Sequence, residues 1–268
     1  MKTLSLGYSP CPNDTFIFYG LVHGGVRDQR IRFKESLLDV ETLNNLALKG
    51  KFDLTKVSFH AYLYLKDQYL LLNAGGALGR GCGPLLVARE PIKIEALRGK
   101  RIAIPGLLTT AFLLLRLYNP EYGKNIVVMP FHEILGAVKS GIVDAGLIIH
   151  ESRFTYLSYG LHEIIDLGRW WEEDTGLPIP LGCIIIKKEY SGIIEEIEGL
   201  IRKSISFAYE NREKVMPYIR ENARELNDSV IERHIDLYVN KYSYDFGPNG
   251  KDAIRELLQR AERAIGGV

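Results

Sequence analysis

Cysteine is scarce in this sequence, and its spacing excludes the uses that proteins make of it in groups. The three cysteines, Cys11, Cys82 and Cys183, are far apart and odd in number, and none belongs to a Cys-x-x-Cys pair. This pattern predicts neither a cysteine-based zinc site nor a disulfide framework. We therefore expect reduced, structural thiols, with Cys11 at most lining a pocket, as in a cytoplasmic protein.

An excess of charge of one sign is also missing. The 268 residues hold 34 Lys and Arg against 33 Asp and Glu, for a formal net charge of +1. Such a balance gives no electrostatic reason to expect nucleic acid or an anionic membrane as a partner. No apolar run reaches the length of a membrane span, and Met1–Tyr8 has no signal-peptide pattern, so we expect a cytoplasmic location.

What the sequence does have is a repeated alternation of short apolar strands with amphipathic helices. This order is typical of βαβ units and predicts an α/β fold with a mainly parallel sheet. In the first half we expect strands at Thr3–Tyr8, Ile31–Leu37, Asp53–Val57, Tyr69–Leu72 and Leu85–Ala88, and helices at Thr15–Val22, Val40–Gly50 and from Ser58 to about Leu65.

A second alternating set follows the linker turn Pro91–Lys100 and ends in a charged, helix-rich tail. Its expected strands are Arg101–Ile104, Ile126–Met129, Asp144–Ile149, Leu161–Leu167 and Leu181–Ile186, its helices Thr109–Tyr118 and Phe131–Gly141, and the tail helices Ile193–Tyr209, Arg212–Glu221, Ser229–Asn240 and Lys251–Ile265. We predict a larger domain of residues 1–90 plus 181–268, an inserted smaller domain of residues 91–180, and a ligand cleft between them.

The glycine-rich segment Asn73–Pro84 is expected to be an irregular loop that lines this cleft. Its spacing fits neither a P-loop nor the dinucleotide fingerprint, so no nucleotide cofactor is predicted. His150 directly follows the apolar run Asp144–Ile149, at the sheet rim where open α/β sheets bind ligands. Imidazole titrates near pH 6.5, so His150 is a chemically suitable general base.

Four strand-to-helix junctions carry polar residues that could share the cleft. Backbone N–H groups at helix N-termini suit carboxylates and other anionic oxygens. Ser58, Thr109 and Asp14 could instead be plain helix caps, which is the usual role of such residues, and Asn13-Asp14 could either cap a helix or contact substrate. The junctions are Asn13-Asp14-Thr15, Lys56-Val57-Ser58, Thr109-Thr110-Ala111 and His150-Glu151-Ser152.

The remaining histidines do not predict a metal centre. His132 and His162 lie in amphipathic contexts typical of surface or packing residues. His60 and His234 form no cluster with metal-ligand spacing, so no metal is expected.

Several long motifs resemble the 1,4-dihydroxy-6-naphthoate synthase family of the futalosine route to menaquinone. The resemblance covers almost the whole chain and weakens only in the helical tail. The motifs are Ser9-Pro-Cys-Pro-Asn-Asp-Thr-Phe-Ile-Phe-Tyr19, Asp39-Val-Glu-Thr-Leu-Asn44, Gly75-Gly-Ala-Leu-Gly-Arg-Gly81, Gly146-Leu-Ile-Ile-His-Glu-Ser-Arg-Phe-Thr-Tyr156 and Trp170-Trp-Glu-Glu-Asp-Thr-Gly-Leu-Pro-Ile-Pro-Leu-Gly182.

The resemblance implies a type II periplasmic-binding-protein-like fold with two α/β domains, a cleft and a helical C-terminal region. It implies a carbon–carbon lyase that converts cyclic dehypoxanthinylfutalosine to 1,4-dihydroxy-6-naphthoate and dihydroxyacetone without a cofactor. The family's base falls on His150, and its substrate-binding residues fall on Lys56, Val57, Ser58, Thr110 and Ala111. Two alternatives remain open: a chorismate dehydratase of the same pathway, and a non-catalytic protein that binds a small anion.

Overall fold

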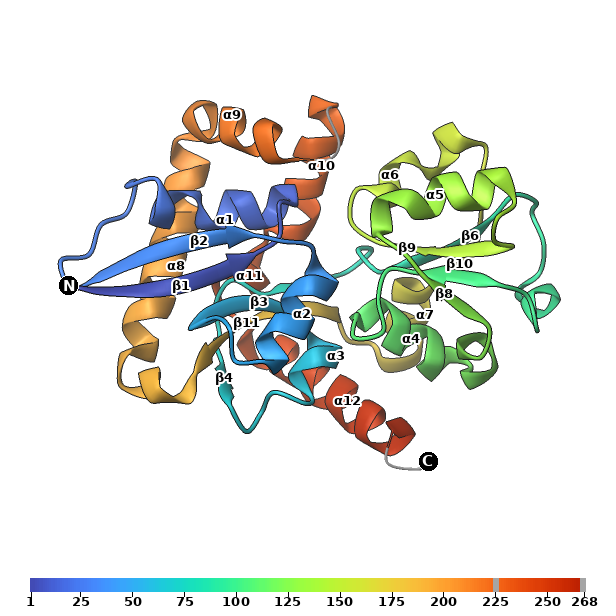
Figure 1. Cartoon of the computed structure of the whole chain (residues 1–268), viewed down its shortest axis with the longest axis horizontal. Coiled ribbons are helices and arrows are strands. Elements are labelled where there is room, and N and C mark those ends of the chain that lie inside the picture. Colours follow the sequence, from blue (N-terminus) through green and yellow to red (C-terminus); the bar gives the residue numbers. More distant parts are fainter. Residues whose placement is uncertain (224–226, 266–268) are drawn as a thin grey trace.

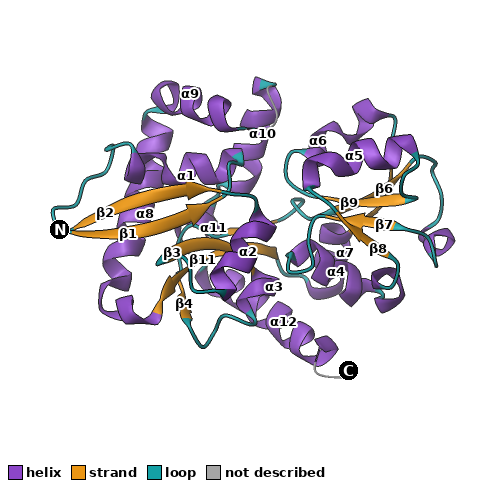
Figure 2. Cartoon of the chain, viewed as in Figure 1, coloured by secondary structure: helices purple, strands orange, loops and turns teal. Residues whose placement is uncertain are grey.

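Each of the two lobes in Figure 1 is built around its own β-sheet. The computed structural model describes residues 1–223 and 227–265. The polypeptide enters the second lobe with β6 (Leu85–Ala88) and returns to the first with β11 (Ile179–Lys187), both labelled in Figure 2. No helix within the described ranges is long and apolar enough to cross a membrane.

The sheet of the large lobe has the order β2-β1-β3-β11-β4, with β5 paired to β11. β1 is parallel to β2 and β3, but β11 runs antiparallel to β3, β4 and β5. The expectation of a mainly parallel sheet was therefore wrong, because strand direction is set by pairing between distant segments. The strands are β1 Lys2–Tyr8, β2 Ile31–Leu37, β3 Leu54–Ser58, β4 Tyr69–Leu71, β5 Ala77–Gly79 and β11 Ile179–Lys187.

Helices from both ends of the chain pack on this sheet. Helix α1 contacts α8, α9 and α10, and it places Phe16 and Phe18 in a fully buried apolar cluster. The helices of the large lobe are α1 Pro12–Val22, α2 Val40–Leu48, α3 Phe59–Tyr62, α8 Ile194–Glu210, α9 Arg212–Asn222, α10 Asp228–Tyr238, α11 Lys241–Tyr244 and α12 Gly247–Ile265.

The sheet of the small lobe has the order β10-β6-β9-β7-β8. β7 is parallel to β8 and β9, whereas β6 is antiparallel to β9 and β10. The predicted boundary at residue 91 assigns Leu85–Ala88 to the large domain, but this strand pairs within the small-lobe sheet. The elements are β6 Leu85–Ala88, β7 Ile102–Ile104, β8 Ile126–Val128, β9 Ala145–Ile148, β10 His162–Asp166, α4 Thr110–Tyr118, α5 Phe131–Ser140, α6 Ser152–Thr155 and α7 Leu167–Thr175, with short 3₁₀ turns at Ile94–Leu97, Pro120–Gly123 and Tyr156–Tyr159. A fourth 3₁₀ turn, Lys188–Ile193, follows β11 in the large lobe.

The start of α1 differs from the sequence-based expectation. The helix begins at Pro12, and its N-cap Cys11 makes no side-chain cap hydrogen bond. Proline suits a first helical position because the N–H that it lacks has no intrahelical acceptor there. Asn13 and Asp14 therefore lie inside the first turn, so the prediction that one of them caps this helix was wrong.

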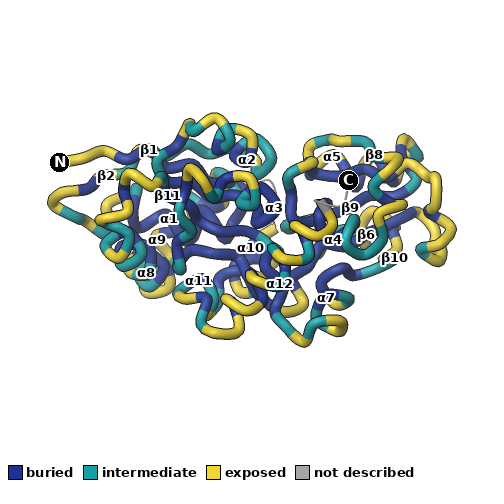
Figure 3. Tube along the Cα trace, turned by 90° about the horizontal axis from the view of Figure 1, so that it is seen from below, coloured by how far each residue is buried: buried dark blue, intermediate teal, exposed yellow. Residues whose placement is uncertain are grey.

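An apolar cluster shared by both lobes lies beside the cleft. It joins Phe59 of α3 and Leu257 of α12 to Leu114 of α4 and Trp171 of α7, all fully buried. Figure 3 shows the buried stretches running through the interior of both lobes while exposed stretches lie on the outer helices and loops. The shared cluster fixes α4, which carries part of the pocket, against the large lobe.

Candidate active site

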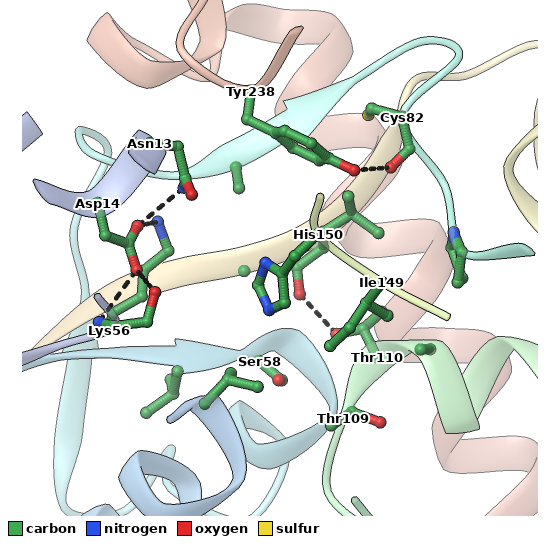
Figure 4. A pocket seen from close by; sticks show the side chains of 18 of the residues that line it. Asn13, Asp14, Lys56, Ser58, Cys82, Thr109, Thr110, Ile149, His150 and Tyr238 are labelled. Carbon is green, nitrogen blue, oxygen red and sulfur yellow. Dashed lines mark hydrogen bonds and ion pairs between the residues drawn. The ribbon is translucent and has the colours of Figure 1, made fainter. Parts of the chain in front are cut away.

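A pocket between the lobes brings together all four polar junctions of the sequence. Its lining includes Asp14, Lys56, Ser58, Thr110 and His150. Figure 4 shows His150 near the centre, with the Asp14–Lys56 pair on one side and Ser58, Thr109 and Thr110 on another. The expectation that these junctions meet in one cleft is confirmed.

The backbone at His150 has an unusual conformation. Strand β9 ends at Ile148, and His150 has φ of 55°, in the left-handed region that residues with a Cβ seldom adopt. Its imidazole packs against the ring of Phe131, with 5.1 Å between centroids. A strained residue at the rim of a pocket is a common sign of a functional constraint.

Burial lowers the pKa of His150 to about 4. The nearby Asp14 carboxylate raises this pKa and the Lys56 ammonium lowers it, so these two effects oppose each other. Desolvation is the larger effect, because it penalises the charged imidazolium directly. His150 is therefore neutral at physiological pH and can accept a proton.

A second histidine, which the sequence did not single out, lies behind His150. His234 of α10 is fully buried, and its ring centroid is 6.2 Å from that of His150. Its Nε2 lies 4.0 Å from Oε2 of Glu151, and neither of its ring nitrogens has a hydrogen-bond partner among the residues that the structure describes. Burial lowers the pKa of His234 well below the usual value. Sequence spacing gave no signal for this pairing, because His234 comes from a distant helix.

Asp14 and Lys56 form a buried ion pair on the large-lobe side of the pocket. Lys56 Nζ lies 2.9 Å from Asp14 Oδ1 and donates to the carbonyl of Gly75 at 3.0 Å. Asp14 also accepts from the Ser9 hydroxyl at 2.7 Å and from Asn13 Nδ2 at 2.9 Å. The positive charge of Lys56 is thus balanced within the protein.

Ser58 lines the pocket but does not cap the short helix α3. Its backbone N–H donates to Asn44 Oδ1 at 2.9 Å, and its hydroxyl accepts from Asn44 Nδ2 at 3.2 Å. Val57, which precedes it, also lines the pocket. The plain-cap alternative is therefore wrong for Ser58.

The N-terminus of α4 forms the small-lobe side. Thr109 is a true N-cap, because its hydroxyl accepts from the N–H of Phe112 at 3.3 Å. The Thr110 hydroxyl donates to the carbonyl of Leu181, in β11 of the large lobe, at 2.6 Å. The amides of Thr110 and Ala111 belong to the first helical turn, where N–H groups lack intrahelical acceptors and suit an anionic oxygen.

One set of side chains in the described part of the chain has ligand atoms close enough to share a metal ion. Atoms of Cys11, His150 and Glu151 all lie within 4.8 Å of one another. Burial raises the pKa of the Cys11 thiol well above its usual value, which disfavours the thiolate that a metal needs. The expectation of no metal stays a prediction.

Comparisons with known proteins agree with the geometry. A family model described as "Menaquinone biosynthesis" matches residues 4–263. A protein named 1,4-dihydroxy-6-naphtoate synthase from Thermus thermophilus is 49% identical over 98% of this chain and 95% of its own. One of the same name from Streptomyces coelicolor is 46% identical over 97% and 93%.

The chain belongs to the 1,4-dihydroxy-6-naphtoate synthase family. It is an enzyme, a lyase of menaquinone biosynthesis, as the sequence motifs predicted.

Solved structures confirm the expected fold. Protein AF1704 from Archaeoglobus fulgidus superimposes with a TM-score of 0.91 at 38% identity, over 99% of this chain and 98% of that one. The periplasmic aliphatic sulphonate binding protein SsuA from Escherichia coli gives a TM-score of 0.69 at 14% identity, over 100% and 88%. The architecture is that of periplasmic binding proteins.

Proposed function

We propose that this enzyme converts cyclic dehypoxanthinylfutalosine to 1,4-dihydroxy-6-naphthoate and dihydroxyacetone, with His150 as the general base. The observation that carries the proposal is the half-buried imidazole of His150 in the pocket, with a pKa lowered to about 4. A base must be unprotonated before it can accept a proton, and this one is neutral across the physiological range.

The reaction would begin when His150 takes an acidic proton from the substrate. Carbon–carbon cleavage would follow, and formation of the aromatic naphthalene ring would drive it forward. General-base catalysis contributes about 10²–10⁴-fold, so placement of the substrate must supply the remainder. The first amides of α4, at Thr110 and Ala111, are suited to hold a carboxylate or a developing oxyanion.

Lys56 enters the proposal in a changed role. Because its ammonium is paired with Asp14, we propose that Lys56 forms part of the fixed charge distribution of the pocket wall and does not move to bind the substrate directly. Val57 and Ser58 then present an apolar and a hydroxyl contact beside it. A cytoplasmic location belongs to the same proposal, supported by three buried cysteines that are all free.

The decisive experiment incubates the purified enzyme with cyclic dehypoxanthinylfutalosine and detects 1,4-dihydroxy-6-naphthoate by mass spectrometry. Product at a rate proportional to enzyme concentration is expected. Parallel incubation with chorismate tests the dehydratase alternative, which predicts 3-enolpyruvyl-benzoate. Reversible binding without consumption of either compound would favour the non-catalytic alternative and overturn the proposal.

A further inference from the structure

A carboxylate of the large lobe accepts a hydrogen bond from the backbone of the small lobe, just before α4. Glu41 lies in the first turn of α2, and its Oε1 and Oε2 lie 3.1 and 3.2 Å from the N–H of Leu108. Leu108 belongs to the loop that joins β7 to α4. The motif Asp39–Asn44, which has no role in the proposed reaction, thus contacts the small lobe through Glu41.

On the large-lobe side, Glu41 continues to Ser58 through one buried amide. Asn44 is fully buried, and its Nδ2 donates to Glu41 Oε2 and to Ser58 Oγ, each at 3.2 Å. Its Oδ1 accepts from the N–H of Ser58 at 2.9 Å. Residues three apart lie on one face of a helix, which allows Glu41 and Asn44 to act together.

On the small-lobe side, Glu41 contacts the segment that places Thr109. A Cβ added at Gly106 would lie 2.3 Å from Cδ of Glu41, so any side chain at this position would displace the Glu41 carboxylate from the place it now holds. The carbonyl of Gly106 accepts from the Thr109 hydroxyl at 2.8 Å, and Thr109 caps α4. Glu41 is therefore linked to both walls of the pocket, to Ser58 through Asn44 and to the start of α4 through the loop at Gly106 and Leu108.

We propose that Glu41 is a positioning residue that sets the spacing between Ser58 and the N-terminus of α4, and so the fit of the pocket to its substrate. The inference rests on the proposed function, because the substrate is what must contact both walls. The hydrogen bonds of Asn44 hold Ser58 in a fixed position relative to Glu41, and the contact with Gly106 does the same for Thr109.

The test measures KM and kcat with cyclic dehypoxanthinylfutalosine for variants of Glu41. Hydrogen bonds to charged groups are strong enough that Glu41→Ala should raise KM about tenfold, with kcat within about threefold of the wild type. Glu41→Asp keeps the charge but is one methylene short, so it should match Glu41→Ala. Glu41→Gln keeps one acceptor oxygen and should be intermediate.

The matched control is Glu133→Ala, which removes an exposed glutamate from the first turn of α5 and should leave both constants unchanged. Melting temperatures of all variants separate a local change of fit from partial unfolding. A KM of Glu41→Ala equal to that of the wild type overturns the inference. So does a Glu41→Asp variant with wild-type KM, because charge and not contact would then be the active feature.

A double variant makes the test independent of simple destabilisation. Gly106→Ala alone should raise KM, because its methyl group would meet Glu41. In the Glu41→Ala background the obstacle is gone, so Gly106→Ala should add little further change. Additive effects of the two substitutions contradict the proposal. A wild-type enzyme without turnover overturns the proposed function and this inference together, whereas unchanged KM in Glu41→Ala beside normal wild-type turnover overturns this inference alone.

Discussion

Two pairs of polar residues lie at the pocket or directly behind it, and they differ in whether their polar atoms have partners. At the Asp14–Lys56 pair, the carboxylate and the ammonium both have close partners. At His150 and His234, burial lowers both pKa values, and within residues 1–223 and 227–265 the ring nitrogens of His234 have no hydrogen-bond partner. The first group holds the wall in place. The second leaves a neutral imidazole ready to accept a proton.

The largest expected effect is the loss of turnover when the base is removed. His150→Ala should lower kcat by about 10²–10⁴-fold, the usual contribution of a general base. Folding and substrate binding should persist, because the side chain lies at the pocket and not in the core. Steady-state kinetics, calorimetric binding and circular dichroism would check this.

The control for that variant is His132→Ala, which removes an exposed histidine and should keep wild-type kcat. Near-wild-type turnover in His150→Ala would show that His150 is not the base, and the contrast with the Asp14–Lys56 pair would then have no catalytic meaning.

Breaking the buried Asp14–Lys56 pair should strongly destabilise the fold. Lys56→Met leaves the buried carboxylate of Asp14 without its counter-charge, which should lower the free energy of unfolding by about 3–5 kcal/mol. Lys66→Met breaks the more exposed pair with Glu262 and should cost no more than about 1 kcal/mol. Urea denaturation measures both. Equal costs would show that the burial of the Asp14–Lys56 pair has no energetic consequence.

Acid should destabilise the fold through its buried histidines. Burial lowers the pKa of His60 to about 4 and that of His234 well below its usual value, whereas both titrate near 6.5 when unfolded. At pH values between the two pKa values, these histidines are therefore protonated in the unfolded state but not in the folded state. As the pH is lowered from about 6.5 to 4, the free energy of unfolding should decrease by about 1.4 kcal/mol per pH unit for each such histidine. Denaturation at pH 7, 6 and 5 would reveal the slope, and His60→Leu should reduce it.

The smallest expected effect concerns His234. Its ring nitrogens are buried and have no hydrogen-bond partner in the described part of the chain, so His234→Phe should raise the free energy of unfolding by about 1 kcal/mol at pH 7. Turnover should fall far less than in His150→Ala. A marked loss of stability would reveal a polar interaction of this ring and weaken the contrast with the paired group. Thermal melting of the two proteins decides between these results.

The elements that the sequence predicted well are those set by local pattern. Strands Ile31–Leu37 and Leu85–Ala88 have the predicted bounds, and Gly141 ends α5 in the left-handed conformation. Apolar alternation and glycine act within a few residues, so the sequence displays them directly.

Features that depend on distant segments were not visible in the same way. The antiparallel direction of β11 follows from its pairing with β3 and β4. Asp14 looked like a helix cap because its carboxylate suits that role, yet Lys56 and Ser9 engage it instead. His234 lies beside His150 only because α10 returns to the large lobe behind the pocket. The family motifs pointed to His150 as the candidate base, whereas its spatial neighbours could be found only from the fold.

The central claim is that neutral His150 accepts the proton, and the pH dependence of kcat/KM for the wild-type enzyme tests it most directly. Since burial lowers the pKa of His150 to about 4, kcat/KM should rise with pH through that value and stay level from about pH 5.5 to 7.5. A decline as pH rises through about 6.5 would mean that the protonated imidazolium is the active form, and would contradict the account.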